Sequence, residues 1–232
     1  MSTRAILLAA TATLACSGGG EAEHVSASER GRLAFDDGSA SAAGTSCASC
    51  HPLEPASDRI YPGGDLHGAT SRSSFWGGQV NDLLRAVNDC RTLFQGLSTL
   101  EASSPEAADL YAFLESLEGP PEPLPFTVAL SVGDLAEGNA ERGLATFDSA
   151  CRPCHGELGS GAQRLSEVIP VLPDEAVTKH ASYSVEEQRL VFVEKVRHGR
   201  FFGYGGFMPP FSLEALPDER LADVLTALEL YR

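Results

Sequence analysis

The sequence contains very little methionine, lysine and tryptophan. Its two methionines are Met1 and Met208, and Trp76 is its one tryptophan. The lysines are Lys179 and Lys195, and the formal net charge is −15 at pH 7. Proteins that bind nucleic acids or anionic membrane surfaces have the opposite charge balance, so the composition excludes both as partners. If the negative charge steers a partner, that partner should present a basic face.

The sequence also lacks an apolar run long enough to cross a bilayer. The apolar run 5–15 is too short to span a membrane and is typical of a signal segment over residues 1–16. Cys16 and the glycine-rich stretch after it resemble a bacterial lipoprotein cleavage site, although Thr13 stands where that pattern prefers leucine. The resemblance implies a lipid on Cys16 that anchors the chain on the periplasmic side of a bacterial membrane without crossing it. The alternative is ordinary signal cleavage, which would leave the protein in the periplasm.

Two pentapeptides, residues 47–51 and 151–155, carry most of the functional information. Both have the pattern C-x-x-C-H, which is the attachment signature of c-type haem. Two thiols three positions apart reach the two vinyl groups of one porphyrin, and the next residue points an imidazole at the iron. The sequence therefore predicts two covalently bound haem c groups, held by Cys47, Cys50, Cys151 and Cys154, with His51 and His155 as iron ligands.

Two other uses of these cysteines fit the sequence less well. A structural zinc site needs four ligands close together, and the two cysteine pairs lie in different halves of the chain. Disulfide bonds within each pair would leave His51 and His155 without a role. An exported chain is also the expected setting for covalent haem.

The two haem motifs have similar flanking sequences, which indicates an internal repeat. Residues 31–36 and 143–148 each place a glycine and a phenylalanine four positions apart, on one face of a helix. Residues 108–114 and 222–228 predict a matching amphipathic helix near the end of each half, with Pro105 and Pro217 as helix start signals. The small glycine should allow another helix to approach closely.

This repeat resembles class I cytochrome c, in which the first and last helices cross around one haem. The resemblance implies an all-α fold with two tandem domains, each wrapped around one covalent haem. Prolines in the sequence between the halves predict a stiff, extended linker. The predicted organisation is a signal or lipoprotein segment (1–16), a tether (17–27), a first domain (28–118), a proline-rich linker (119–133) and a second domain (134–232).

Met208 is the predicted second axial ligand of the second haem. In cytochrome c domains, a methionine beside a proline, after the haem motif and before the last helix, is the usual distal ligand, and Met208 precedes Pro209. His198 is a weaker alternative. A His/Met haem has a relatively high potential and binds few external ligands, which favours electron transfer.

The first haem has no methionine for this position. Alignment of the two halves places Gln95 opposite Met208, and glutamine is a poor ligand for haem iron. Cys90 is a candidate ligand because it is the cysteine left unassigned, and a thiolate would lower the haem potential. His67 is a further candidate, and an iron that is open or binds water would need no side chain at this position.

Two catalytic families resemble the first half. Residues 87–90 and 94–96 resemble dihaem thiosulfate dehydrogenases, in which a cysteine ligates the first haem, but Arg72, Arg85 and Arg91 do not follow that family's spacing. Residues 31–36, 46–51 and 75–78 resemble dihaem cytochrome c peroxidases, although this chain is shorter. Arg72 is a candidate contact of a haem propionate, and Trp76 is expected to pack on the haem edge.

The sequence thus predicts a dihaem electron carrier outside the cytoplasmic membrane. Its partners would be other redox proteins or a respiratory complex. Two different functions also fit the sequence. One is a catalytic dihaem cytochrome, with the first haem as the active site and the second as the relay, and the other is a sensor that binds small ligands at an open first haem.

Overall fold

The computed structural model describes residues 25–56, 58–131, 133, 135–201 and 206–231. In these ranges the fold is all-α, as the sequence predicts, and its one β interaction is an isolated antiparallel bridge between Phe75 and Val80. Cys16 and the predicted signal segment lie outside the described residues. The helices are α1 (Ala27–Asp36), α2 (Cys47–Cys50), α3 (Leu83–Cys90), α4 (Pro105–Ser116), α5 (Ala140–Ala150), α6 (Arg152–His155), α7 (Glu175–Thr178), α8 (Val185–His198) and α9 (Asp218–Ala227), with two short 3-10 helices, η1 (Ala69–Ser71) and η2 (Trp76–Gly78), and a π-helix, η3 (Arg91–Gln95).

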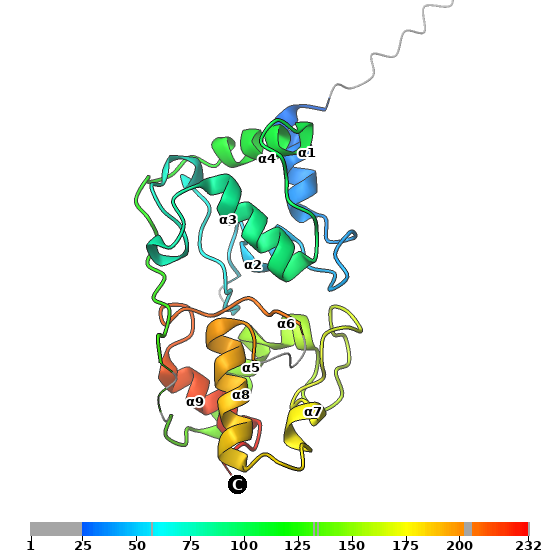
Figure 1. The fold of residues 1–232 in the computed structure, drawn as a ribbon, viewed down its shortest axis with the longest axis vertical. Coiled ribbons are helices and arrows are strands. Elements are labelled where there is room, and N and C mark those ends of the chain that lie inside the picture. Colours follow the sequence, from blue (N-terminus) through cyan, green and yellow to red (C-terminus); the bar gives the residue numbers. More distant parts are fainter. Residues whose placement is uncertain (1–24, 57, 132, 134, 202–205, 232) are drawn as a thin grey trace, which may run out of the picture.

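The helices form two bodies, one above the other in Figure 1. The first body contains α1 to α4 and the second contains α5 to α9. Each body has its own hydrophobic core beneath the crossing of its first and last helices. The core of the first body is centred on Phe35, Leu100, Ala107, Leu110, Phe113 and Leu114, and that of the second on Phe147, Val191, Phe192, Leu216, Leu221 and Leu225.

A glycine sits at each helix crossing, as the repeated sequence predicts. A Cβ atom on Gly31 would lie 2.0 Å from the carbonyl oxygen of Asp109, and a Cβ on Gly143 would lie 2.0 Å from that of Asp223. Because these distances are far below van der Waals contact, only glycine lets α1 approach α4, and α5 approach α9, this closely.

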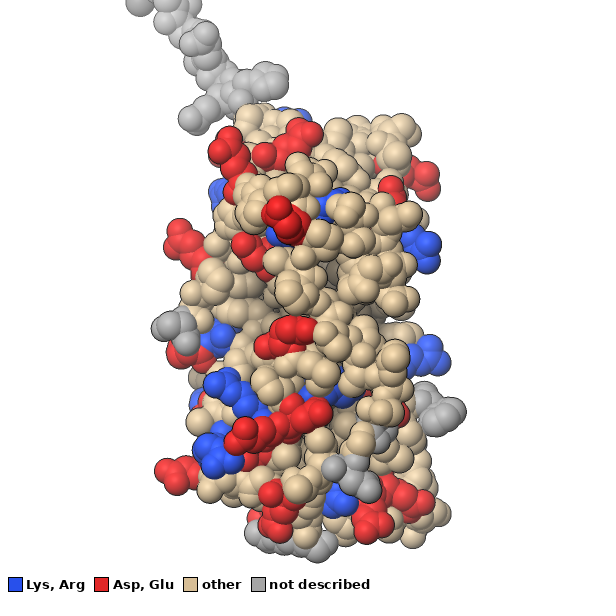
Figure 2. Space-filling model, turned by 90° about the vertical axis from the view of Figure 1, so that its left-hand side faces the viewer, with Lys and Arg blue, Asp and Glu red and all other residues tan. Residues whose placement is uncertain are grey.

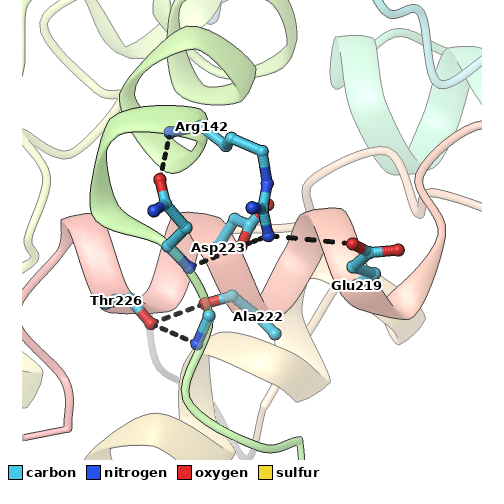
Figure 3. Close-up of polar contacts among 7 residues, drawn as sticks. Arg142, Glu219, Ala222, Asp223 and Thr226 are labelled. Carbon is cyan, nitrogen blue, oxygen red and sulfur yellow. Dashed lines mark hydrogen bonds and ion pairs between the residues drawn. The ribbon is translucent and has the colours of Figure 1, made fainter.

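An arginine–aspartate ion pair joins the two helices at each crossing, beside the glycine. Arg30 donates from Nε and Nη2 to the two carboxylate oxygens of Asp109, at 2.7 and 2.6 Å. Arg142 makes the same two-point contact with Asp223, with both distances 2.8 Å (Figure 3). Burial alone would raise the pKa of Asp223, which is 2% exposed, but hydrogen bonds from Arg142 and from the backbone of Asn139 bring that pKa below its ordinary value. Sequence analysis missed both arginines, although each immediately precedes its crossing glycine.

The segments between the haem motifs and the closing helices contain α3 and α8, which the repeat did not reveal. The start of α8 is marked by a capping box, in which Ser184 accepts from the amide of Glu187 and the Glu187 carboxylate accepts from the amide of Ser184. Gly199 ends the helix in the left-handed conformation. The start of α3 has a similar signal, since Asp82 caps it by accepting from the amide of Arg85.

The proline-rich segment is free of helix in its described residues, and it packs against both bodies. The Phe126 ring contacts the Trp76 ring edge-on, with centroids 5.4 Å apart. A few residues on, the amide and hydroxyl of Thr127 donate to the carboxylate of Glu214 and lower its pKa to about 2. The segment therefore contacts the first body through Phe126 and the second through Thr127. No helix in the described part of the chain is both long and apolar enough to cross a membrane.

Candidate haem-binding sites

The first C-x-x-C-H motif lies on the wall of a large apolar cavity. The cavity encloses about 1290 Å³ of space free of protein atoms, part of it open to solvent. Cys47, Cys50 and His51 all line it. Apolar side chains form most of the remaining wall: Phe35, Leu66, Phe75, Trp76, Leu83, Val87, Phe94, Leu110 and Leu114.

Both motif histidines are oriented by a backbone carbonyl. The Nδ1 atom of His51 lies 2.8 Å from the carbonyl oxygen of Gly64, and that of His155 lies 2.9 Å from the carbonyl oxygen of Pro170. Because a carbonyl only accepts, Nδ1 carries the proton and Nε2 keeps its lone pair for a metal. Burial lowers the pKa of both imidazoles, which favours this neutral form.

A glycine packs directly on the ring of His51. A Cβ atom on Gly63 would come within 2.5 Å of Cε1 and 2.6 Å of Nδ1 of this imidazole. The glycine backbone therefore fixes the plane of the ring beside the cavity. Sequence analysis did not identify this residue, because its role depends on a contact with a separate segment.

The motif cysteines are free thiols. Burial raises the pKa of Cys50 and of Cys151 to about 12, and it also raises the pKa of Cys47 and of Cys154. Each of these sulfurs is therefore protonated at neutral pH and outside a disulfide, as the precursor of a thioether bond must be.

Arg72 lines the first cavity with one donor unused. Its Nη1 and Nη2 atoms donate to the carbonyl oxygens of Asp65 and His67, at 2.8 and 2.6 Å. Its Nε is buried and has no acceptor among the residues that the structure describes. A buried donor of this kind is costly unless a ligand supplies an acceptor, and a haem propionate is a negatively charged acceptor. The oriented histidine, the two thiols and this donor all fit haem c.

Cys90 lines the same cavity as the first motif. It is the last residue of α3, and the π-helix η3 begins at the next residue. Short π-helical turns next to α-helices often occur at functional sites. Burial, together with the neighbouring Cys50 and Cys47, raises the pKa of the Cys90 thiol, so this residue is a protonated thiol unless a metal displaces the proton.

The remaining two candidate side chains for the first iron differ in position. Gln95 is buried and lines the cavity, but its amide nitrogen donates to the carbonyl oxygen of Thr45 at 3.2 Å. His67 is not among the described residues that line the cavity, and its Nδ1 atom is 2.6 Å from the carboxylate of Asp65. The structure thus brings Cys90 and Gln95 to the site and leaves the side chain of His67 outside it.

In the second body, Met208 is held against the end of α8. Its amide donates to the carbonyl oxygen of Gly199 at 2.8 Å, and its side chain packs on the second core, as does Cys151. The rival ligand His198 is engaged elsewhere, since its two ring nitrogens contact the carboxylate of Glu194 and the carbonyl oxygen of Ala129. These contacts favour Met208 over His198.

The first cavity also contains residues that sequence analysis placed outside the first domain. Pro209 and Pro210, which follow Met208, line it from the second body. Leu124, Pro125 and Phe126 line it from the proline-rich segment. No signal in the sequence indicates this, because the contacts join segments that are far apart along the chain.

Comparison with known proteins identifies part of the chain. Residues 138–226 match the family model of cytochrome c oxidase, cbb3-type, subunit III. No curated protein matches the sequence. A thiosulfate dehydrogenase structure from Marichromatium purpuratum is 14% identical with a TM-score of 0.41, and the match covers 87% of this chain and 45% of that one. SoxXA from P. pantotrophus is 16% identical with a TM-score of 0.30, and the match covers 87% of this chain and 72% of that one.

This chain therefore spans less than half of the thiosulfate dehydrogenase structure. The matched residues run from just before α5 into α9 and include the second C-x-x-C-H motif. Covalent haem c and electron transfer are the general properties of cytochrome c domains. The second half of this chain contains a cytochrome c family domain similar to the cbb3-type oxidase subunit III.

Proposed function

We propose that the protein is a dihaem c-type cytochrome that transfers electrons outside the cytoplasmic membrane. The observation that carries the proposal is the first cavity, whose motif residues Cys47, Cys50 and His51 lie outside the residues matched by the family model. Its wall holds two thiols and an imidazole whose Nε2 has no hydrogen-bond partner in the described part of the chain, as covalent haem c requires. One haem c would be held by Cys47, Cys50 and His51, and the other by Cys151, Cys154 and His155.

The surroundings of the two sites would give them different redox properties. Haem c, when bound, supplies a one-electron couple whose potential depends on its axial ligands and on burial. Met208 as the second axial ligand would raise the potential in the second body, while Cys90 as a thiolate would lower it in the first. In the first cavity, Arg72 would hold a propionate, and the apolar wall would limit the access of water.

The redox partners in this proposal are other electron-transfer proteins or a respiratory complex. The net charge of −15 favours a partner with a basic docking face. Figure 2 shows acidic and basic side chains interspersed on one side of the molecule, without a continuous patch of one sign. On this side, the charge would therefore act on encounter as a long-range field rather than through one acidic patch.

Haem content tests the proposal directly. Intact-mass spectrometry of the exported protein should show two covalent haems. The double variant Cys47→Ala/Cys50→Ala should lose one, and Cys151→Ala/Cys154→Ala should lose the other. Cys90→Ala is the matched control and should keep both. A wild-type protein with a single haem, or a first double variant that still carries two, would contradict the proposal.

Cys16 is the proposed site of a membrane anchor. Because acyl chains bind a bilayer through their buried methylene groups, the wild-type protein should sediment with membranes, while Cys16→Ser should appear mainly in the soluble periplasmic fraction. Ser17→Ala leaves the cysteine intact and should behave as wild type. Retention of Cys16→Ser in the membrane fraction would show that another feature anchors the chain.

A further inference from the structure

The two haem motifs approach each other at the boundary between the bodies. Figure 1 shows α2 at the edge of the first body that faces the second, and α6 at the opposing edge of the second body. The amide of Ile60 donates to the carbonyl oxygen of Ser149 at 3.0 Å, two residues before Cys151. The hydroxyl of Ser166 donates to the carbonyl oxygen of Ala42 at 2.8 Å. These bonds fix the neighbourhood of one motif to that of the other.

Arg59 lies at this boundary. The next residue, Ile60, packs against the core of the second body, and the Arg59 guanidinium carbon lies 4.6 Å from the centre of the Tyr61 ring. The backbone of the same segment also bonds to the first motif, because the amide of Gly63 donates to the carbonyl oxygen of Cys50 at 3.2 Å. The segment that carries Arg59 is thus bonded to the first motif through Gly63 and to the residues just before the second motif through Ile60.

The charge of Arg59 is not neutralised locally. Within the part of the chain that the structure describes, no carboxylate lies within ion-pair distance of this side chain, whereas Arg30, Arg142 and Arg197 each contact an aspartate. The Tyr61 ring supports the guanidinium without cancelling its charge. Arg59 is therefore a cation at the boundary between the bodies that forms no ion pair with a described carboxylate.

We infer that the charge of Arg59 acts on both haem sites and raises the reduction potential of each. A nearby positive charge disfavours the oxidised iron, which carries one more positive charge than the reduced iron, so it favours reduction. Since the side chain is exposed, salt should weaken the effect. The inference rests on the proposed function, because it requires both haems to be bound.

Redox titration of the full-length dihaem protein tests this inference. In Arg59→Gln, both midpoint potentials should fall. At a fixed potential, the ratio of oxidised to reduced haem should rise about threefold or more at each site. Arg59→Lys keeps the positive charge, so both of its midpoint potentials should stay close to those of the wild type. Arg189→Gln is a matched control. Arg189 also lies over a tyrosine ring, with its guanidinium carbon 4.3 Å from the centre of the Tyr231 ring. It is near the start of α8, away from the boundary between the bodies. It should leave both potentials unchanged.

The outcomes separate this inference from the proposed function. Mass spectrometry of the same samples confirms that two haems are attached before the titration. If both are present and Arg59→Gln shifts neither potential, or only one, the shared role of Arg59 is wrong and the dihaem function stands. If the wild-type protein holds fewer than two haems, the proposed function fails and the inference fails with it. A fall in both wild-type potentials with rising salt, reduced in Arg59→Gln, would support the electrostatic cause.

Discussion

Replacing Gly143 with alanine is expected to lower the free energy of unfolding of the second body by about 3 kcal/mol or more. The added Cβ would lie 2.0 Å from the carbonyl oxygen of Asp223 and 2.9 Å from the Cβ of Ala227. The first of these neighbours is backbone, so the clash cannot be relieved by a side-chain rotation. The helices α5 and α9 would have to separate.

Separation of these helices would also break the contacts that cross them. The Asp223 carboxylate, 2% exposed, accepts two hydrogen bonds from Arg142 and one from the amide of Asn139. A buried carboxylate that loses these donors is strongly unfavourable. The alanine would therefore add an electrostatic cost to the steric one.

Urea denaturation of the purified protein, followed by circular dichroism, measures this effect. Gly206→Ala is the control, since a Cβ there meets no atom of the described residues within 4 Å, and its stability should stay within about 0.5 kcal/mol of wild type. Gly31→Ala should destabilise the first body in the same way, because its Cβ would lie equally close to Asp109. A Gly143→Ala protein that unfolds at the wild-type denaturant concentration would show that the crossing is looser than the structure indicates.

Replacing Cys90 with alanine is expected to change the spectrum of the first haem and to leave that of the second unaltered. Cys90 lines the cavity that contains the first motif and stands at the junction of α3 and a π-helical turn. Electron paramagnetic resonance of the oxidised wild-type protein should show a thiolate-ligated low-spin signal, which should vanish in Cys90→Ala. Loss of the thiolate should also raise the potential of this haem.

Two measurements make the Cys90 prediction specific. Met208→Ala is the matched control, because it removes the proposed ligand of the second haem and should alter that haem alone. After reduction, Cys90→Ala should bind carbon monoxide at the first haem, which has lost a ligand. Unchanged haem spectra in Cys90→Ala would exclude Cys90 as a ligand and leave Gln95 or an open iron. The open iron would favour a catalytic or sensor function.

Local sequence determined the features that depend on neighbouring residues. The C-x-x-C-H spacing predicts haem attachment because three thiol and imidazole positions lie within little more than one helical turn. The glycine and phenylalanine spacing predicted the closely crossing helices, and proline at 105 and 217 marked the starts of α4 and α9. Helix periodicity, capping and turn chemistry are local, so they can be read without the fold.

Tertiary structure alone decided which distant residues share a site. It brings Cys90 and Gln95 to the first cavity and leaves His67 outside, although all three lie between the first motif and α4. It also adds Pro209 and Pro210 from the second body. The Nε of Arg72, buried without an acceptor among the described residues, likewise follows from how the segments pack, and so does the place of the Arg59 segment at the boundary between the bodies. Such contacts depend on the relative placement of separate segments, which spacing along one chain does not encode.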